Sequence, residues 1–101
     1  MTCEQSFGPY IKALRLAKHL NQVEVAENVG IKKQYLSRIE NNHDVPAEDI
    51  LIRLAITLDE DPYEMVVKAG KVPSDFRDLI VSDQSIFEYL KQKSIEKTNG
   101  V

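Results

Sequence analysis

Polar and cationic side chains line one face of a predicted helix over residues 32–41. The segment reads K-K-Q-Y-L-S-R-I-E-N, and its apolar residues Leu36 and Ile39 mark the buried side. The other side carries hydrogen-bond donors: Lys33, Gln34, Ser37, Arg38 and Asn41. Glutamine and arginine side chains can each make two hydrogen bonds at once, to the major-groove edges of adenine and guanine respectively. This face therefore predicts base contacts by Lys33, Gln34, Ser37 and Arg38.

The start of the same helix is strongly basic. Lys32 and Lys33 stand where a capping serine or threonine is common. Two cations at the positive end of a helix cost up to about 1 kcal/mol each. A helix start that meets phosphate groups gains from these two lysines, whereas a purely structural helix does not. The alternative is that both lysines are ordinary solvated surface charges. Tyr35 is predicted to be a half-buried packing residue, with a DNA contact as its alternative.

A preceding helix, starting at Gln22, must position this one. Its apolar face is formed by Val23, Val25, Ala26 and Val29. Gly30 follows, and glycine readily adopts the positive φ that reverses the chain. Ala26 is small enough for two helices to cross closely, and Leu36 anchors the second helix in the core. A small residue, a glycine and an apolar residue at these offsets are typical of a helix-turn-helix.

The pattern Q-x-x-x-A-x-x-x-G-x-x-x-x-x-L-S-x-I-E resembles the motif of the phage-repressor and Cro-like regulators, also called the xenobiotic-response-element family. The matching residues are Gln22, Ala26, Gly30, Leu36, Ser37, Ile39 and Glu40. The resemblance covers residues 7–70, with the motif at residues 22–41, and implies an all-α, five-helix DNA-binding domain. It also implies that Arg15 forms an ion pair with Glu40.

The same resemblance implies contacts with the DNA backbone. It places Gln22 and the loop of Asn41, Asn42 and His43 beside phosphate groups. Gln22 would be the first residue of its helix, where free N–H groups and the helix dipole attract an anion. Lys32, at the start of the next helix, is predicted to contact phosphate for the same reason.

Apolar periodicity and capping signals predict further helices over residues 7–19, 47–58, 62–69, 74–81 and 84–96. Residues 1–6 are expected to be frayed, and residues 98–101 to form a disordered tail. The family-like domain is predicted to end at Gly70. Residues 71–97 then form two additional C-terminal helices that are too apolar for a free tail. They are expected to fold back on the domain or to meet a second subunit, and we predict dimerisation.

Charge is distributed unevenly along the chain, whose formal net charge is −3. Residues 7–43 hold six basic and three acidic residues, whereas the segment from Asp44 onward holds seven basic and twelve acidic ones. The basic part would orient one face toward phosphates, while the acidic part would limit non-specific binding. A chance asymmetry on a solvated surface is the alternative.

Composition argues against several other classes of protein. With 101 residues, 43% of them hydrophobic and 29% charged, the chain is predicted to be an ordinary globular domain. A single cysteine, Cys3, argues against a disulfide framework, and the first six residues lack the features of a signal peptide. No apolar run approaches the roughly 20 residues of a membrane span. His19, His43 and Cys3 are too scattered for a metal site, and no nucleophile or phosphate-loop motif is present. We therefore expect no cofactor and no enzymatic activity.

These observations predict a cytoplasmic transcriptional regulator, associated with the nucleoid when bound to DNA. It would bind a palindromic operator in double-stranded DNA as a homodimer and act as a repressor. The alternative is a protein-binding module, such as an adaptor or antitoxin-like partner, whose C-terminal helices contact another protein. The cationic helix face favours DNA, because a pure protein-binding surface would more often be apolar or acidic.

Overall fold

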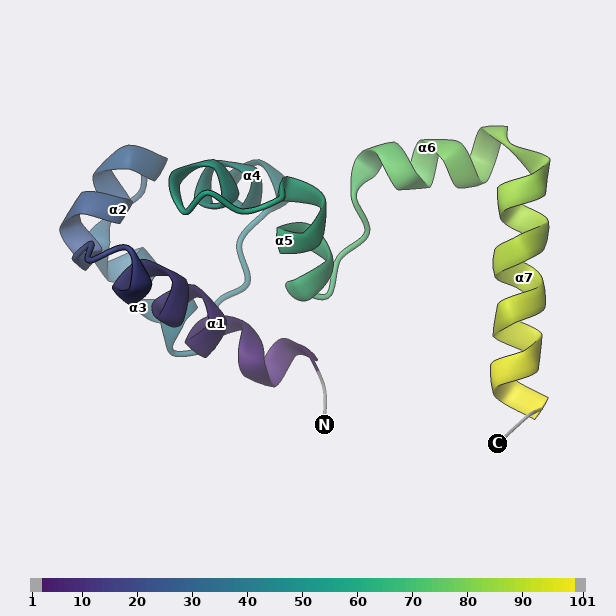
Figure 1. Cartoon of the computed structure of the whole chain (residues 1–101), viewed down its shortest axis with the longest axis horizontal. Coiled ribbons are helices and arrows are strands. Elements are labelled where there is room, and N and C mark those ends of the chain that lie inside the picture. The colour runs from purple at the N-terminus through teal and green to yellow at the C-terminus, as the bar shows by residue number, and fades with distance from the viewer. Residues whose placement is uncertain (1–2, 100–101) are drawn as a thin grey trace. The chain divides into compact units, whose positions relative to one another are not determined.

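The computed structural model describes residues 3–99, with side chains described over residues 7–97. Within that part of the chain all regular secondary structure is helical, which confirms the predicted all-α class (Figure 1). The helices are α1 (Cys3–Ala17), α2 (Gln22–Val29), α3 (Lys33–Glu40), α4 (Glu48–Thr57), α5 (Pro62–Lys68), α6 (Ser74–Ser82) and α7 (Gln84–Asn99). The first five correspond to the repressor-like domain, and the last two to the additional C-terminal helices.

The chain divides into two compact units, Met1–Lys71 and Val72–Val101. The first unit packs α1 to α5 around one apolar core. Fourteen side chains form that core: Phe7, Ile11, Val25, Ala26, Val29, Leu36, Ile39, Leu51, Leu54, Ala55, Leu58, Met65, Val66 and Ala69. In the second unit, α6 and α7 contact each other and meet at a bend at Asp83 (Figure 1).

Local capping explains where α2 and α5 begin. The Asn21 side chain accepts a hydrogen bond from the Glu24 N–H, and the Glu24 carboxylate accepts one from the Asn21 N–H, so the two residues form a capping box. At α5, the Asp61 carboxylate accepts from the Tyr63 N–H at 2.8 Å, directly before Pro62. Within each signal the residues are at most three positions apart, so both helix starts are fixed locally.

The ends of α1 and α7 differ from the predicted ones. Residues 3–6, expected to be frayed, are helical, while residues 1 and 2 lie outside the described residues. At its other end α1 stops at Ala17, two residues early, because the chain turns at His19 with a φ of 58°. α7 continues to Asn99, so residues 98 and 99 of the expected disordered tail are helical; residues 100 and 101 lie outside the described part.

Candidate nucleic-acid interface

The turn between α2 and α3 has the geometry that its glycine predicted. Gly30 has a φ of 87°, and its N–H donates to the Ala26 carbonyl oxygen at 2.8 Å. The next residue, Ile31, donates to the same carbonyl at 3.0 Å, which closes the end of α2. Val25, Ala26 and Val29 are buried, but Val23 is 45% exposed, contrary to its predicted place on the apolar face. Three inward residues already fill the buried stripe of this two-turn helix.

A buried ion pair fastens α3 to α1. Arg15 Nε donates to Glu40 Oε2 at 2.6 Å, and Arg15 Nη2 donates to Glu40 Oε1 at 3.0 Å. The two side chains are only 8% and 2% exposed. A third donor, Gln22 Nε2, lies 3.0 Å from Glu40 Oε1, and Arg15 Nη1 donates to the Leu20 carbonyl at 2.9 Å. The hydrogen bonds to Glu40 raise the pKa of the Arg15 guanidinium further above its ordinary value.

The second turn of α1 also lies close to the end of α3. Gly8 N–H donates to Asn42 Oδ1 at 2.7 Å, and a Cβ added at Gly8 would overlap the backbone carbonyl of Glu40. Asn42 has a φ of 63°, a left-handed conformation that asparagine tolerates better than most residues. Sequence reasoning missed this contact, because its partners are 34 residues apart and no local pattern links them.

The outer face of α3 carries the side chains that were predicted to read bases. Lys33, Gln34 and Arg38 are exposed and Ser37 is half-buried, while Leu36, Ile39 and Glu40 fill the inner face. Tyr35 is half-buried and packs against the core, as the packing interpretation predicted. At the start of the helix, Lys32 occupies the N-cap position and its side chain makes no capping hydrogen bond. The first N–H groups of α3 are therefore without a side-chain cap.

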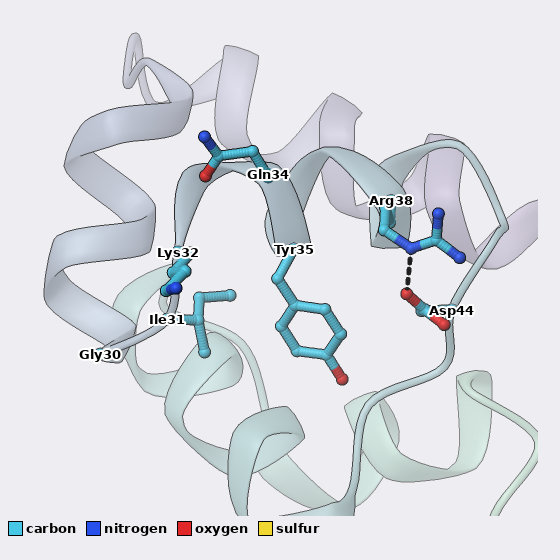
Figure 2. A pocket seen from close by; sticks show the side chains of 7 residues that line it. All are labelled: Gly30, Ile31, Lys32, Gln34, Tyr35, Arg38 and Asp44. Atoms are coloured by element: carbon cyan, nitrogen blue, oxygen red, sulfur yellow. Dashed lines mark hydrogen bonds and ion pairs between the residues drawn. The ribbon is translucent and has the colours of Figure 1, made fainter.

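An ion pair that the sequence analysis did not predict lies on this face. Figure 2 shows the Arg38 guanidinium beside Asp44, a half-buried residue of the loop that follows α3. Arg38 Nε donates to Asp44 Oδ2 at 2.5 Å, and this bond raises the pKa of Arg38. The only signal in the sequence was an acid placed six residues beyond an arginine, directly after a cationic helix.

The residues predicted to contact phosphates lie around the two ends of α3. Gln22 is half-buried at the start of α2 and already donates to Glu40, while Lys32 and His43 are exposed. Asn41 Nδ2 donates to the Ser37 carbonyl oxygen at 2.8 Å. Asn42 is also engaged through Gly8. The structure therefore places these residues near the two ends of α3, with side-chain hydrogen bonds inside the domain at three of the five.

Two features of other protein classes are missing from the described part of the chain. No helix there is both long and apolar enough to cross a membrane. The described residues also contain no group of three or more histidine, cysteine or acidic residues able to hold a metal ion.

Comparisons of sequence identify similar proteins. The model of the helix-turn-helix family matches residues 11–65. An uncharacterised HTH-type transcriptional regulator of Mycobacterium tuberculosis is 32% identical over 89 residues, which cover 84% of this chain and 64% of that protein. The ImmF control region 10 kDa protein of Bacillus phage phi105 is 40% identical over 57 residues, covering 56% of this chain and 63% of that protein. The chain thus spans less than two thirds of the length of these relatives.

Comparison of structures finds the same architecture in a chain of the SinR protein/SinI protein complex. The TM-score is 0.56 and the sequence identity 27%. The match covers 92% of this chain and 99% of that chain, so it includes helices of both compact units.

Proposed function

Because this chain belongs to the phage-repressor and Cro-like helix-turn-helix family, we propose that it is a sequence-specific DNA-binding transcriptional regulator. It binds a palindromic operator as a homodimer and represses transcription by excluding other proteins from that DNA. The observation that carries the proposal is the exposed outer face of α3, where Lys33, Gln34 and Arg38 project from a helix whose only acidic residue, Glu40, is buried.

The proposed docking follows from the two sides of α3. Its inner side is fixed to the domain, so its outer side enters the major groove, with Lys33, Gln34, Ser37 and Arg38 facing base edges. Lys32 and the loop residues Asn41, Asn42 and His43 lie toward the phosphates.

Gln22 keeps its proposed phosphate contact despite its bond to Glu40. A glutamine amide has two N–H donors, and the bond to Glu40 uses one of them. The second remains for a phosphate oxygen at the start of α2, where the helix dipole favours an anion. Glu40 would then orient Gln22 as well as hold Arg15.

Dimerisation is proposed to occur through α6 and α7. Apart from Pro73, no residue described in residues 72–97 is buried, so this unit has no core of its own. An apolar groove of about 430 Å³ lies between the two helices. It is lined by Val72, Phe76, Leu79, Ile80, Ile86 and Leu90. Two helices cannot bury such a surface by themselves, and a second copy of the same helices would cover it.

Selection of binding sites from random double-stranded DNA, using the full chain, tests the DNA-binding proposal. An inverted repeat with half-sites about 34 Å apart is expected. Arg38→Ala should relax the preference at one base pair, whereas Lys32→Ala should weaken binding to all sequences. The Lys32 variant should also reduce the slope of log K against log salt by about 1. If no sequence is enriched and neither variant changes DNA binding, the proposal fails.

Sedimentation of full-length variants tests the dimer. Leu79→Glu places a charge in the apolar groove and should shift the protein to monomer. Val81→Glu is the matched control, because Val81 is on the same helix, is 88% exposed and does not line the groove. A Leu79 variant that stays dimeric would move the interface elsewhere.

A second function is favoured by one comparison, since the similar solved chain belongs to a complex named for two different proteins, SinR and SinI. Under this alternative, the α6–α7 groove takes helices of another protein instead of a second copy. A wild-type chain that sediments as a monomer at micromolar concentration would favour that account over the homodimer.

A further inference from the structure

Arg38 carries a constraint that the other exposed residues of α3 do not show. Its guanidinium is held by Asp44, at an Nε–Oδ2 distance of 2.5 Å, whereas the side chains of Lys33 and Gln34 make no hydrogen bond or ion pair within the described residues. In Figure 2 both partners line a hollow that Gln34 and Tyr35 also line. The side chain of Asp44 is 35% exposed and that of Arg38 57% exposed, so the pair is open to a ligand.

The atoms used in this bond decide what Arg38 has left to offer. An arginine has five N–H donors, and the bond to Asp44 engages Nε–H. The two terminal amino groups keep their outward hydrogens. A pair of such donors matches O6 and N7 of guanine in the major groove. Asp44 therefore does not compete with a base for these donors, and it restricts the rotation of the plane that carries them.

The negative charge of Asp44 is unfavourable for DNA binding in general. An acidic residue beside a DNA-facing helix repels phosphates, so it lowers affinity for every sequence. Within the described residues 30–43, the only other acidic residue is Glu40, which is buried against Arg15. An acid that lowers general affinity but fixes an arginine favours selectivity over tight binding.

We propose that Asp44 is a positioning residue that orients Arg38 to recognise a guanine. The inference rests on the proposed DNA-binding function and extends it to one base pair in each half-site. An arginine held in advance loses less side-chain freedom on binding, and the fixed plane penalises bases that do not match its two donors.

Asp44→Asn removes the charge and keeps the shape, so its effects on affinity and selectivity should oppose each other. Affinity for non-specific DNA should rise, because a repulsive charge is lost. Discrimination at the base pair read by Arg38 should fall. A bidentate arginine contact distinguishes bases by roughly 5- to 150-fold, and loss of orientation should remove a factor of about 3 to 10 of that.

The experiment titrates wild type, Asp44→Asn, Arg38→Ala and their double variant against three kinds of DNA. These are the selected operator, its single-base variants and non-specific duplex. Glu27→Gln is the matched control, because Glu27 is an exposed acid of the same unit that does not pair with Arg38. Melting temperatures of all variants are compared first, so that a folding defect is recognised.

Support for the positioning role requires two results together. Asp44→Asn must reduce discrimination at the same base pair as Arg38→Ala, and it must have no further effect in the absence of Arg38. Glu27→Gln must leave discrimination unchanged. If the Asp44 and Glu27 variants change affinity alike for all sequences, Asp44 acts only as a charge and the inference is overturned. A rise in discrimination on removing Asp44 would also overturn it, since the acid would then withhold Arg38 from the base.

Failure of the underlying function gives a different result. If wild type shows no sequence preference, the proposed DNA-binding function itself fails. If wild type is selective but Arg38→Ala changes no base preference, DNA binding stands while the role of Arg38, and with it that of Asp44, is removed.

Discussion

Replacing Arg15 by methionine should cost this fold more stability than any surface change. Methionine keeps the apolar stem and removes the guanidinium, which leaves the Glu40 carboxylate, 2% exposed, with Gln22 as its remaining side-chain donor. Removing one partner of a buried ion pair costs about 3–5 kcal/mol, because an uncompensated charge stays in the interior. The Leu20 carbonyl oxygen also loses its donor.

The expected change in melting temperature follows from that free energy. For a unit of this size, 1 kcal/mol corresponds to about 4–8 °C, so Arg15→Met should melt at least about 12 °C below wild type. Thermal unfolding followed by circular dichroism measures it, at fixed protein concentration because association alters the apparent stability. Lys12→Met is the matched control, since Lys12 is exposed on the same helix, and its effect should stay within about 0.5 kcal/mol.

A double variant separates the ion pair from other effects of the substitution. Arg15→Met combined with Glu40→Met removes both charges, and an apolar replacement of a whole buried pair is often neutral or stabilising. The double variant should therefore melt above Arg15→Met alone. If Arg15→Met melts within about 2 °C of wild type, or if the two single effects simply add, the pair does not hold α1 to α3 and the reasoning is refuted.

Three further predictions test local features of the fold. Gly8→Ala should destabilise by about 1–3 kcal/mol in thermal melting, because the new Cβ would meet the α3 backbone, although alanine normally favours a helix. Asn21→Ala should cost about 1 kcal/mol through loss of the capping box, while Asn28→Ala on the same helix should change little. The Ser85 hydroxyl and N–H donate to Asp83 and lower the pKa of its carboxyl. Folding therefore favours the ionised carboxylate of Asp83. The stability that this carboxylate gives α7 is complete above the ordinary pKa of aspartate and is lost as pH falls through the lowered pKa of Asp83. NMR shifts of the first turn of α7, followed during an acid titration, should show this loss.

Local signals explain why most helices could be predicted from the sequence. The Asn21–Glu24 capping box, the positive φ at Gly30 and the Asp61–Pro62 start each depend on residues at most three apart. Apolar periodicity placed the remaining elements, with errors of one to four residues at their ends. The early end of α1 was missed because no glycine marks the left-handed turn that follows it, and His19 adopts that conformation instead.

Contacts between distant segments could not be derived in the same way. The pairing of Arg15 with Glu40 spans 25 residues, and only the family resemblance suggested it. No local pattern singles out Gly8, because its close approach to α3 depends on a partner 34 residues later. Asp44 was counted only as part of an acidic half of the chain. Its bond to Arg38 depends on how the loop folds back after α3, which no helical period encodes.

The contrast between α2 and α3 links stability to the proposed DNA contact. α2 is closed at both ends, by its capping box and by Gly30. α3 begins at Lys33, directly after an N-cap residue, Lys32, that makes no side-chain capping bond, and each of these two cations costs up to about 1 kcal/mol.

The inner face of α3 offsets that cost. Leu36 and Ile39 are fully buried, and each contributes roughly 1.5–3 kcal/mol of burial free energy, while Glu40 is tied to Arg15. The inner face therefore supplies the main packing of the helix. On the outer side, Ser37 and Arg38 bond to the loop that follows, and a phosphate at the helix N-terminus would remove the electrostatic penalty of the two lysines.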